Sequence, residues 1–260
     1  MRPIRRNVVV HTPEEIVRIR RAAQLTAQVR DEVARQARAG MSTWELDQVA
    51  GALIAETGGK SAFLNYHGYP GYICISVNDE VVHGIGRPDR VLLPTDIVSI
   101  DLGVQIDGAC GDTALTFGLG APLPEPTRNL LEATEKALKA GIARAVAGNY
   151  IRDISQAVEA VGHRAGVGIV RDFVGHGCGI RLHEPPEVPN YVVPARGPQL
   201  VPGMVLAIEP MFNEGSYQVT VDAVDGWTVR TRDGSNAAHF EHMVLITENE
   251  PEILTWPKTM

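Results

Sequence analysis

The hydrophobic positions of this chain follow a helical period in some segments and a strand period in others. Helices are predicted for residues 13–37, 43–57, about 127–146 and about 151–165. The first two open with capping boxes, T-P-E-E at Thr12 and S-T-W-E at Ser42, and glycines follow their last turns. Strands follow each pair of helices, and a proline-rich linker around Pro122 separates the two sets. The pattern predicts an α/β (α+β) chain built from two halves of similar make-up.

Shorter apolar runs predict the strands. They lie at residues 73–77, 81–83, 97–106, 114–117, 204–208, 219–224, 227–231 and 239–246. Residues 97–117 are typical of a β-hairpin that turns at Asp107-Gly108, and Asp233-Gly234 predicts a second hairpin turn. The first hairpin is the element around which we expect the rest of the chain to be organised.

Each strand of that hairpin carries a carboxylate where the pattern predicts core, Asp101 in the first and Asp112 before the second. An aspartate near a strand end is ordinarily a turn or cap residue, which suits Asp107. An ionised carboxylate inside a core, however, is unfavourable by several kcal/mol unless it is paired. We therefore expect Asp101 and Asp112 to have a cationic partner, and we take that partner to be metal.

Three downstream residues extend this set. His176 lies between glycines in V-G-H-G-C-G-I, Glu209 follows an apolar strand, and Glu241 lies within the last predicted strand. Four carboxylates and one neutral imidazole carry a formal charge of about −4, which two divalent cations would cancel. Oxygen-rich ligands with one nitrogen and no thiolate suit Mn²⁺, Fe²⁺ or Co²⁺, and they admit Zn²⁺.

Composition excludes several other classes. A net charge of −7 without a basic face argues against nucleic acid as a general partner. No apolar run approaches the roughly 18 residues of a transmembrane helix, and the apolar run after the basic residues 1–6 is too short for a signal peptide. The cysteines, which number 3, form no C-x-x-C pair, so free thiols are expected. We therefore expect a cytoplasmic protein with no membrane partner.

The five candidate ligands stand in the order and local contexts of the methionine aminopeptidases. The segments N-D-E-V-V-H-G-I before them and L-H-E-P-P after His176 also resemble that family, and the resemblance covers about residues 13–247. It implies the pita-bread fold, with an antiparallel central sheet, helices outside, and pseudo-symmetric halves at about 13–121 and 122–248 of one catalytic domain. The spacing of 32 positions from Glu209 to Glu241 leaves no room for the helical insertion of type II enzymes. The resemblance is therefore to bacterial type I enzymes.

The resemblance also implies a role for each residue of the site. Asp101 would chelate one ion, Asp112 and Glu241 would bridge both, and His176 and Glu209 would complete the ligands of the other ion. Two such ions lower the pKa of a shared water and present hydroxide to an amide carbonyl. Glu209 would either relay the proton of this water or act as a ligand alone.

Two further histidines are implied to contact the substrate. His83 would contact the scissile peptide, and His183 would donate a hydrogen bond to the developing oxyanion. A lone histidine is more often a packing or surface residue, and we expect that of the others. These are His11, His67, His163, His239 and His242. Alternation along a strand predicts that His242 points away from the face used by Glu241.

The aromatic-rich segment 63–71 predicts either a pocket wall or a small core beneath a loop. By resemblance, the pocket for an N-terminal methionine side chain consists of Phe63, Tyr66, Tyr69, Cys74 and Trp227. The chain would then remove the initiator methionine from nascent chains whose second residue is small, as a monomer that docks transiently at the ribosome. Three residues depart from the family pattern, and they are Phe63, Gly86 and Leu182.

Three other functions fit parts of the pattern. Xaa-Pro aminopeptidases and prolidases share the five ligands, but Asp101 comes too early in this chain for their additional N-terminal domain. A non-catalytic binding protein on the same fold would be expected to have lost ligands. A thiol hydrolase that uses Cys178 and His176 would need two near neighbours in sequence to adopt the geometry of a nucleophile and its base.

Overall fold

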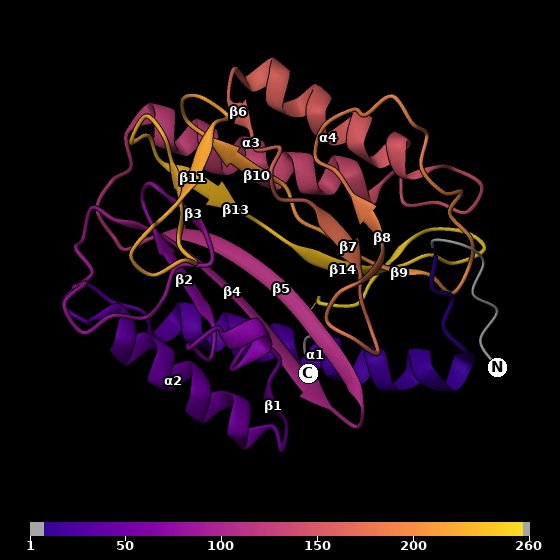
Figure 1. Cartoon of the computed structure of the whole chain (residues 1–260), viewed down its shortest axis with the longest axis horizontal. Helices are drawn as coiled ribbons and strands as arrows, with labels where there is room; N and C mark the ends of the chain where they lie inside the picture. The colour runs from indigo at the N-terminus through magenta and orange to yellow at the C-terminus, as the bar shows by residue number, and fades with distance from the viewer. Residues whose placement is uncertain (1–7, 257–260) are drawn as a thin grey trace.

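Two pairs of helices flank a layer of antiparallel strands (Figure 1). The computed structural model describes residues 8–256, so the basic residues 1–6 lie outside the described part of the chain. Its α-helices are α1 (Pro13–Gln36), α2 (Thr43–Glu56), α3 (Glu125–Ile142) and α4 (Ile151–Ala165). Both predicted capping boxes are confirmed: Thr12 Oγ1 accepts from Glu15 N at 3.2 Å, and Ser42 Oγ accepts from Glu45 N at 3.1 Å. The sequence thus specifies where the first two helices begin.

The third helix is displaced from its predicted bounds. It starts two residues earlier than expected, because Pro126 is tolerated in a first helical turn whose N–H groups have no partner within the helix. It ends at Ile142 rather than near Val146, and turns follow in which Ala145 N donates to Ile142 O. A further turn in this connection contains Gly148, which has a φ of 92°.

Within the described residues the strands form four hydrogen-bonded sheets, all with antiparallel pairing. The first sheet holds β1 (Lys60–Ser61), β2 (Cys74–Val77), β4 (Ile97–Ile106) and β5 (Ala109–Gly118). The second holds β6 (Gly168–Ile169), β10 (Met211–Asn213) and β13 (Ala237–His239). The third holds β3 (Glu80–Val82), β11 (Val219–Val221) and β12 (Val229–Thr231). The fourth holds β7 (Gly175–Gly177), β8 (Glu184–Val188), β9 (Val205–Ile208), β14 (His242–Leu245) and β15 (Glu252–Ile253).

The predicted hairpin is confirmed as β4 and β5. Its turn is formed by Asp107 (φ 51°) and Gly108 (φ 70°), a pair of left-handed residues of the kind that a two-residue hairpin turn requires. The second strand begins at Ala109 rather than after Asp112, so Asp112 lies within the strand. The hairpin therefore carries both aspartates on regular, paired backbone.

Strand β5 also connects the two halves of the molecule. Thr113 Oγ1 donates to Glu241 O at 2.8 Å, and Glu241 N donates to Ala114 O at 3.0 Å. Three residues further along β5, Thr116 Oγ1 donates to His239 O at 2.8 Å. These contacts seat the segment between β13 and β14 against the hairpin, so residues far apart in sequence meet at the centre of the layer.

Two predictions for the C-terminal region were wrong. The strand expected at 239–246 is divided into β13 and β14, and Glu241 lies in the break because the chain changes partners there, from β10 to β9. Asp233-Gly234 does not close a hairpin, since β12 and β13 belong to different sheets. Instead, Asp233 Oδ2 accepts from Ser216 N, which ties this turn to a neighbouring loop.

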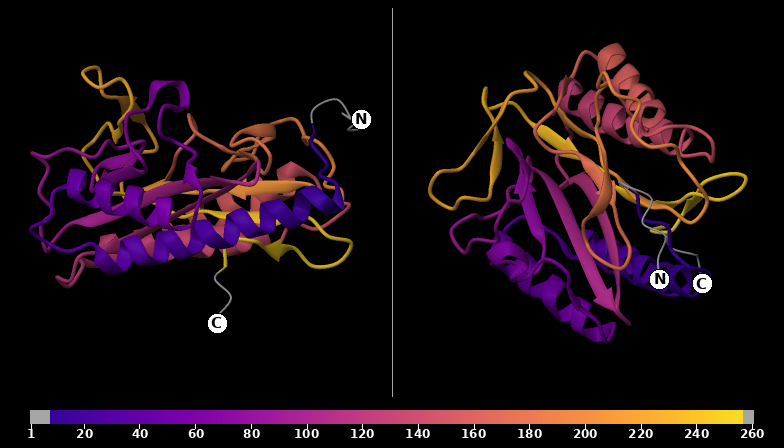
Figure 2. Two further views of the ribbon diagram at one scale, coloured as in Figure 1. Left: turned by 90° about the horizontal axis from the view of Figure 1, so that it is seen from below. Right: turned by 45° about the vertical axis from the view of Figure 1, so that its right-hand side comes forward.

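The helices cover the layer from two sides. Helix α1 packs on β4 and β5, and α2 packs on β1 and β2 (Figures 1 and 2). Helix α3 packs against β9, β10 and β13, and α4 packs against α3, β6 and β8. The hairpin of β11 and β12 and the segment 63–71 project from one face, visible at the top of the left view in Figure 2. Among the helices of residues 8–256, none combines the length and apolarity needed to span a bilayer.

Candidate metal centre and pocket

The two aspartates of the hairpin lie on the same face of β4 and β5. Asp101 is opposite Ala114 and Asp112 is opposite Gly103, so their positions are diagonal neighbours in the ladder. Asp112 is only 3% exposed. The register alone therefore directs both carboxylates into the same region.

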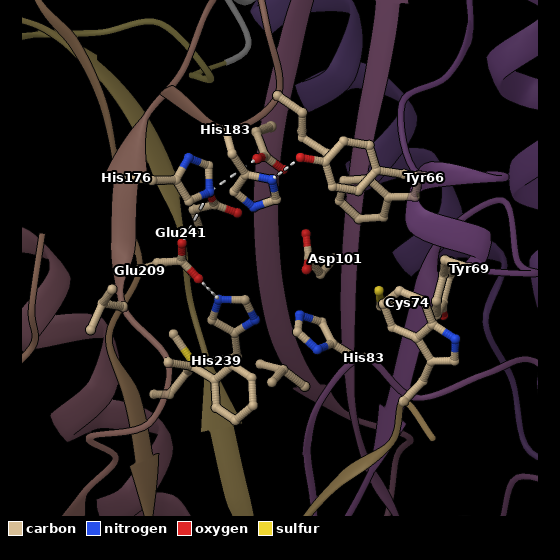
Figure 3. Close-up of a pocket in the computed structure, with 18 of the residues that line it drawn as sticks. Tyr66, Tyr69, Cys74, His83, Asp101, His176, His183, Glu209, His239 and Glu241 are labelled. Carbon is tan, nitrogen blue, oxygen red and sulfur yellow. Dashed lines mark hydrogen bonds and ion pairs between the residues drawn. The ribbon is translucent and has the colours of Figure 1, made fainter. Parts of the chain in front are cut away.

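The other candidate ligands come from the fourth sheet. His176 lies in β7 opposite Ala207 of β9, and Glu209 follows the end of β9 directly. His176 Nε2 lies 3.3 Å from Glu209 Oε1 and 3.7 Å from Asp112 Oδ2. Ligand atoms of Asp112, His176 and Glu241 lie within 4.8 Å of one another. The fold thus gathers acidic side chains from both halves around one imidazole (Figure 3).

The tautomer of His176 follows from its backbone contact. Its Nδ1 lies 2.9 Å from Gly177 O, and because a carbonyl can only accept, Nδ1 carries the hydrogen. Burial lowers the pKa of His176 to about 3, so the ring is neutral near pH 7. Nε2 then presents a lone pair toward the carboxylates, which is the form that binds metal.

The carboxylates resist ionisation in the absence of a cation. Burial, the larger cause, raises the pKa of Asp101 to about 7 and that of Glu209 to about 8. Burial and then repulsion from neighbouring carboxylates hold the pKa values of Asp112 and Glu241 well above their ordinary range. A positively charged partner would favour the ionised form of these carboxyls, so the group should bind a cation strongly.

Oxygen atoms in this group are also without hydrogen bonds. Within residues 8–256, no donor reaches Asp101 Oδ1, Asp112 Oδ1 or Glu241 Oε1, although all three atoms are buried. A buried acceptor without a partner costs roughly 1 to 3 kcal/mol. Buried oxygens without donors, beside the lone pair of His176, fit the ligand shell of a divalent metal ion.

His83 and His183 line the same cavity as the carboxylates. His83 follows β3 in the left-handed region, with a φ of 60°, and its ring meets Phe173 edge to face at 5.4 Å. Burial, and then neighbouring His239 and His183, lower the pKa of His83 to about 4. His183 Nδ1 lies 2.7 Å from Tyr66 Oη, and its ring centroid is 4.2 Å from that of His176. Both rings are therefore held beside the acidic group.

An apolar pocket adjoins the carboxylates in one cavity of about 190 Å³. The five residues expected to form its wall all line this cavity, and they are Phe63, Tyr66, Tyr69, Cys74 and Trp227. Tyr69 packs edge to face on Trp227 at 5.2 Å and donates its hydroxyl to Gly84 O at 2.7 Å. Figure 3 shows Tyr66, Tyr69 and Cys74 on one side, with His176, Glu209 and Glu241 on the other. The cavity therefore offers an apolar end and a charged end.

The three departures from the family pattern have distinct positions. Phe63 and Leu182 belong to one buried cluster with Tyr69 and Cys74, and both line the apolar end of the cavity. Gly86 lies against the start of α2: a Cβ there would approach Asp47 Cβ to 2.9 Å and Thr43 O to 3.1 Å. A larger residue at position 86 would require α2 to shift, which explains the glycine.

Some residues of the cavity were not anticipated. We expected His67 and His239 to be structural, but both line the cavity, as do Phe173 and Met211. His239 could have been found from the pattern, because residues two apart share a face of extended chain and His239 stands two before Glu241. His242 behaves as predicted: its Nδ1 lies 2.8 Å from Thr255 Oγ1.

The position of Cys178 argues against a thiol hydrolase. Its side chain is fully buried in a core cluster with Ile19 and Val205. Burial raises the pKa of the Cys178 thiol well above its ordinary value, so the thiolate that a nucleophile requires is disfavoured.

Comparisons with known proteins agree with the geometry. The model of metallopeptidase family M24 matches residues 17–248. Methionine aminopeptidase 1 of Mycobacterium tuberculosis is 45% identical over 267 residues, covering 98% of this chain and 99% of that protein. The crystal structure of a methionine aminopeptidase from Thermotoga maritima superposes with a TM-score of 0.92 at 40% identity, covering 95% of this chain and 99% of that one.

More distant structures share the fold alone. The prolidase of Pyrococcus furiosus superposes with a TM-score of 0.78 at 22% identity, and the match covers 96% of this chain but 66% of that one. The pita-bread fold expected from the sequence is confirmed by both kinds of neighbour. With a family match across most of its length and close relatives of equal length, the chain belongs to metallopeptidase family M24, among its methionine aminopeptidases.

Proposed function

We propose that this chain removes the N-terminal methionine from nascent proteins and peptides whose second residue is small. The observation that carries the proposal is one cavity in which an apolar, aromatic wall adjoins four carboxylates and His176, with Asp112 and Glu241 buried. Space of about 190 Å³ equals that of roughly six water molecules, enough for one side chain and its backbone amine.

Two divalent ions would be held by the five ligands. Asp101 would hold one, His176 and Glu209 the other, and Asp112 and Glu241 would be shared between them. When bound, such ions supply Lewis acidity and lower the pKa of water toward neutrality. Mn²⁺, Fe²⁺ and Co²⁺ suit this oxygen-rich set with one nitrogen, and Zn²⁺ is also admitted.

The side chains around the scissile bond would handle its protons and charge. Tyr66 keeps its hydroxyl hydrogen because burial raises its pKa, so it can donate to His183 Nδ1 at 2.7 Å. The hydrogen of His183 is then on Nε2, where it can stabilise the oxyanion of the substrate carbonyl. His83, which follows β3, would contact the scissile peptide, and Glu209 would accept a proton from the attacking water.

Specificity for methionine would come from the apolar end of the cavity. A methionine side chain is unbranched and polarizable, and its sulfur makes favourable contacts with aromatic rings such as Tyr66, Tyr69 and Trp227. Phe63 and Leu182 add apolar surface to the same end of the cavity, which suits an apolar side chain. Cys74 faces Asp101 across β2 and β4 and so joins the apolar end to the acidic one.

The remaining parts of the proposal concern the setting of the enzyme. Ligands come from residues 13–121 and from 122–248, so the halves are proposed to act as one catalytic domain. The substrate is the N-terminus of a nascent chain, which places the protein in the cytoplasm, where it would act as a monomer with transient ribosome docking. No membrane or nucleic-acid partner is invoked.

A substrate comparison tests the proposal against its alternatives. The protein is incubated with Met-Ala-Ser and with an Xaa-Pro dipeptide, before and after chelation and again after Mn²⁺ or Co²⁺ is restored. We expect hydrolysis of Met-Ala-Ser alone, lost with chelator and recovered with metal. Turnover of only the Xaa-Pro dipeptide would indicate a prolidase, and no turnover of either would favour a binding protein.

A further inference from the structure

His239 is the last residue of β13, and its side chain enters the cavity (Figure 3). The residue is only 1% exposed. Among residues 8–256, neither ring nitrogen finds a hydrogen-bond partner of good geometry, yet Nε2 lies 3.3 Å from Glu209 Oε2. Burying an imidazole without a hydrogen bond lowers the stability of the fold, so its position beside a carboxylate points to a function for the pair.

The backbone of His239 is held firmly in place. Thr116 Oγ1 accepts from His239 N at 2.9 Å and donates to His239 O at 2.8 Å. Ser99 Oγ lies 2.7 Å from Thr116 Oγ1 and can donate the second hydrogen bond that this oxygen accepts. Two hydroxyls of the β4–β5 hairpin therefore fix the position from which the imidazole reaches Glu209.

Glu209 is flanked by two imidazoles. Its Oε1 lies 3.3 Å from His176 Nε2, and its Oε2 lies 3.3 Å from His239 Nε2. The ligand atoms that converge within 4.8 Å come from Asp112, His176 and Glu241, and His239 is not part of that set. One carboxylate oxygen thus faces the candidate metal centre, while the other faces His239.

We propose that His239 is a positioning residue, whose Nε2–H donates to Glu209 Oε2 and keeps Oε1 turned toward His176. The inference deepens the proposed function and rests on its metal centre. Groups that orient a ligand in this way change metal affinity by about 10- to 100-fold when they are removed. His239 would therefore set how tightly the centre holds its ions without touching them.

Calorimetric titration of the metal-free protein with Mn²⁺ and with Co²⁺ tests this role. His239→Leu fills similar space without a donor, and we expect about 10- to 100-fold weaker binding. His239→Gln retains an N–H donor, and we expect its affinity to remain within about threefold of the original protein. His242→Leu is the matched control, because His242 lies beside Glu241 but contacts Thr255, and its affinity should be unchanged.

The results of this titration distinguish the role of His239 from the existence of the metal centre. If His239→Leu binds metal as tightly as the original protein, the positioning role is wrong. If Leu and Gln both weaken binding and both shift the visible absorption of bound Co²⁺, His239 is a ligand and the proposal fails. If the original protein binds neither ion, the proposed metal centre itself is wrong. Should His239→Leu not fold, His239→Met supplies the variant without a donor.

Discussion

At the scale of single residues, the hydrogen-bond partners of each side chain determine its tautomer or its charge. Gly177 O fixes the tautomer of His176, and the Tyr66 hydroxyl, when it donates to His183 Nδ1, leaves the hydrogen of that ring on Nε2. By contrast, one oxygen each of Asp101, Asp112 and Glu241 finds no donor within residues 8–256, and a cation would satisfy it. The reactivity of this centre depends on which atoms carry hydrogens. Substitutions that change a hydrogen or a charge but keep the shape of the side chain therefore test it.

Replacing Asp101 with asparagine removes one carboxylate but keeps its shape. We expect metal affinity to fall by more than the roughly 10- to 100-fold lost with an outer partner, and hydrolysis of Met-Ala-Ser to be abolished. The metal-free variant should unfold at the same temperature or higher at pH 8, because one buried charge is gone. Calorimetry and a peptide assay measure both effects, and activity that survives would exclude the metal centre as described. His176→Ala should behave alike in the assay.

Replacing Tyr66 with phenylalanine removes the hydroxyl that contacts His183 while leaving the ring in the pocket wall. A hydrogen bond is worth about 1 kcal/mol net, which corresponds to roughly a fivefold fall in kcat. KM should change little, because the apolar surface remains. Steady-state kinetics would show this, with Tyr72→Phe as the control, since Tyr72 lies outside the cavity. If kcat and KM are both unchanged, Tyr66 acts only as a wall of the pocket.

At the scale of elements, sequence patterns predict the features that depend on neighbouring residues, such as helix starts and turns. Capping boxes at Thr12 and Ser42 mark where α1 and α2 begin, and Asp107-Gly108 marks the turn of the hairpin. The break at Glu241 could not be predicted, because the run from 239 to 246 remains compatible with one strand and only a change of partner divides it. The four acids and His176 were recognisable from their contexts, but their distances depend on tertiary contacts across β5.

One contact between elements has a measurable effect on stability. His11 Nε2, just before α1, lies 3.3 Å from Glu184 Oε2 at the start of β8, and neither side chain is exposed. His11→Leu leaves that buried oxygen without its partner, so we expect a loss of about 1 to 3 kcal/mol in the free energy of unfolding. Denaturant titration measures it. In the double variant with Glu184→Leu most of the loss should be recovered, and an equally unstable double variant would contradict this pairing.

At the scale of the whole molecule, the two halves bring carboxylates together, and their mutual repulsion destabilises the metal-free fold. The hairpin contributes Asp101 and Asp112, and the C-terminal half contributes His176, Glu209 and Glu241. Without metal, protons must replace the missing positive charge, so folding and metal binding are linked through pH. Folded Asp101 and Glu209, with pKa values of about 7 and 8, keep protons that unfolded carboxyls release near pH 4.

The sign of this linkage can be tested above pH 6.5. Below that value the buried histidines oppose the effect, since His83 and His176 have pKa values lowered to about 4 and about 3 and resist the charge they take up when unfolded. Between pH 6.5 and 8 only the carboxylates with raised pKa values contribute, and their stabilisation is lost as pH rises through the folded pKa. The metal-free protein should therefore lose about 1 kcal/mol or more of unfolding free energy per pH unit. Denaturant titrations at several pH values would show the decline, and saturating Mn²⁺ should remove it because the bound carboxylates hold no protons. A metal-free protein whose stability is flat or rising across this interval would mean that its acids are already neutralised by something other than protons.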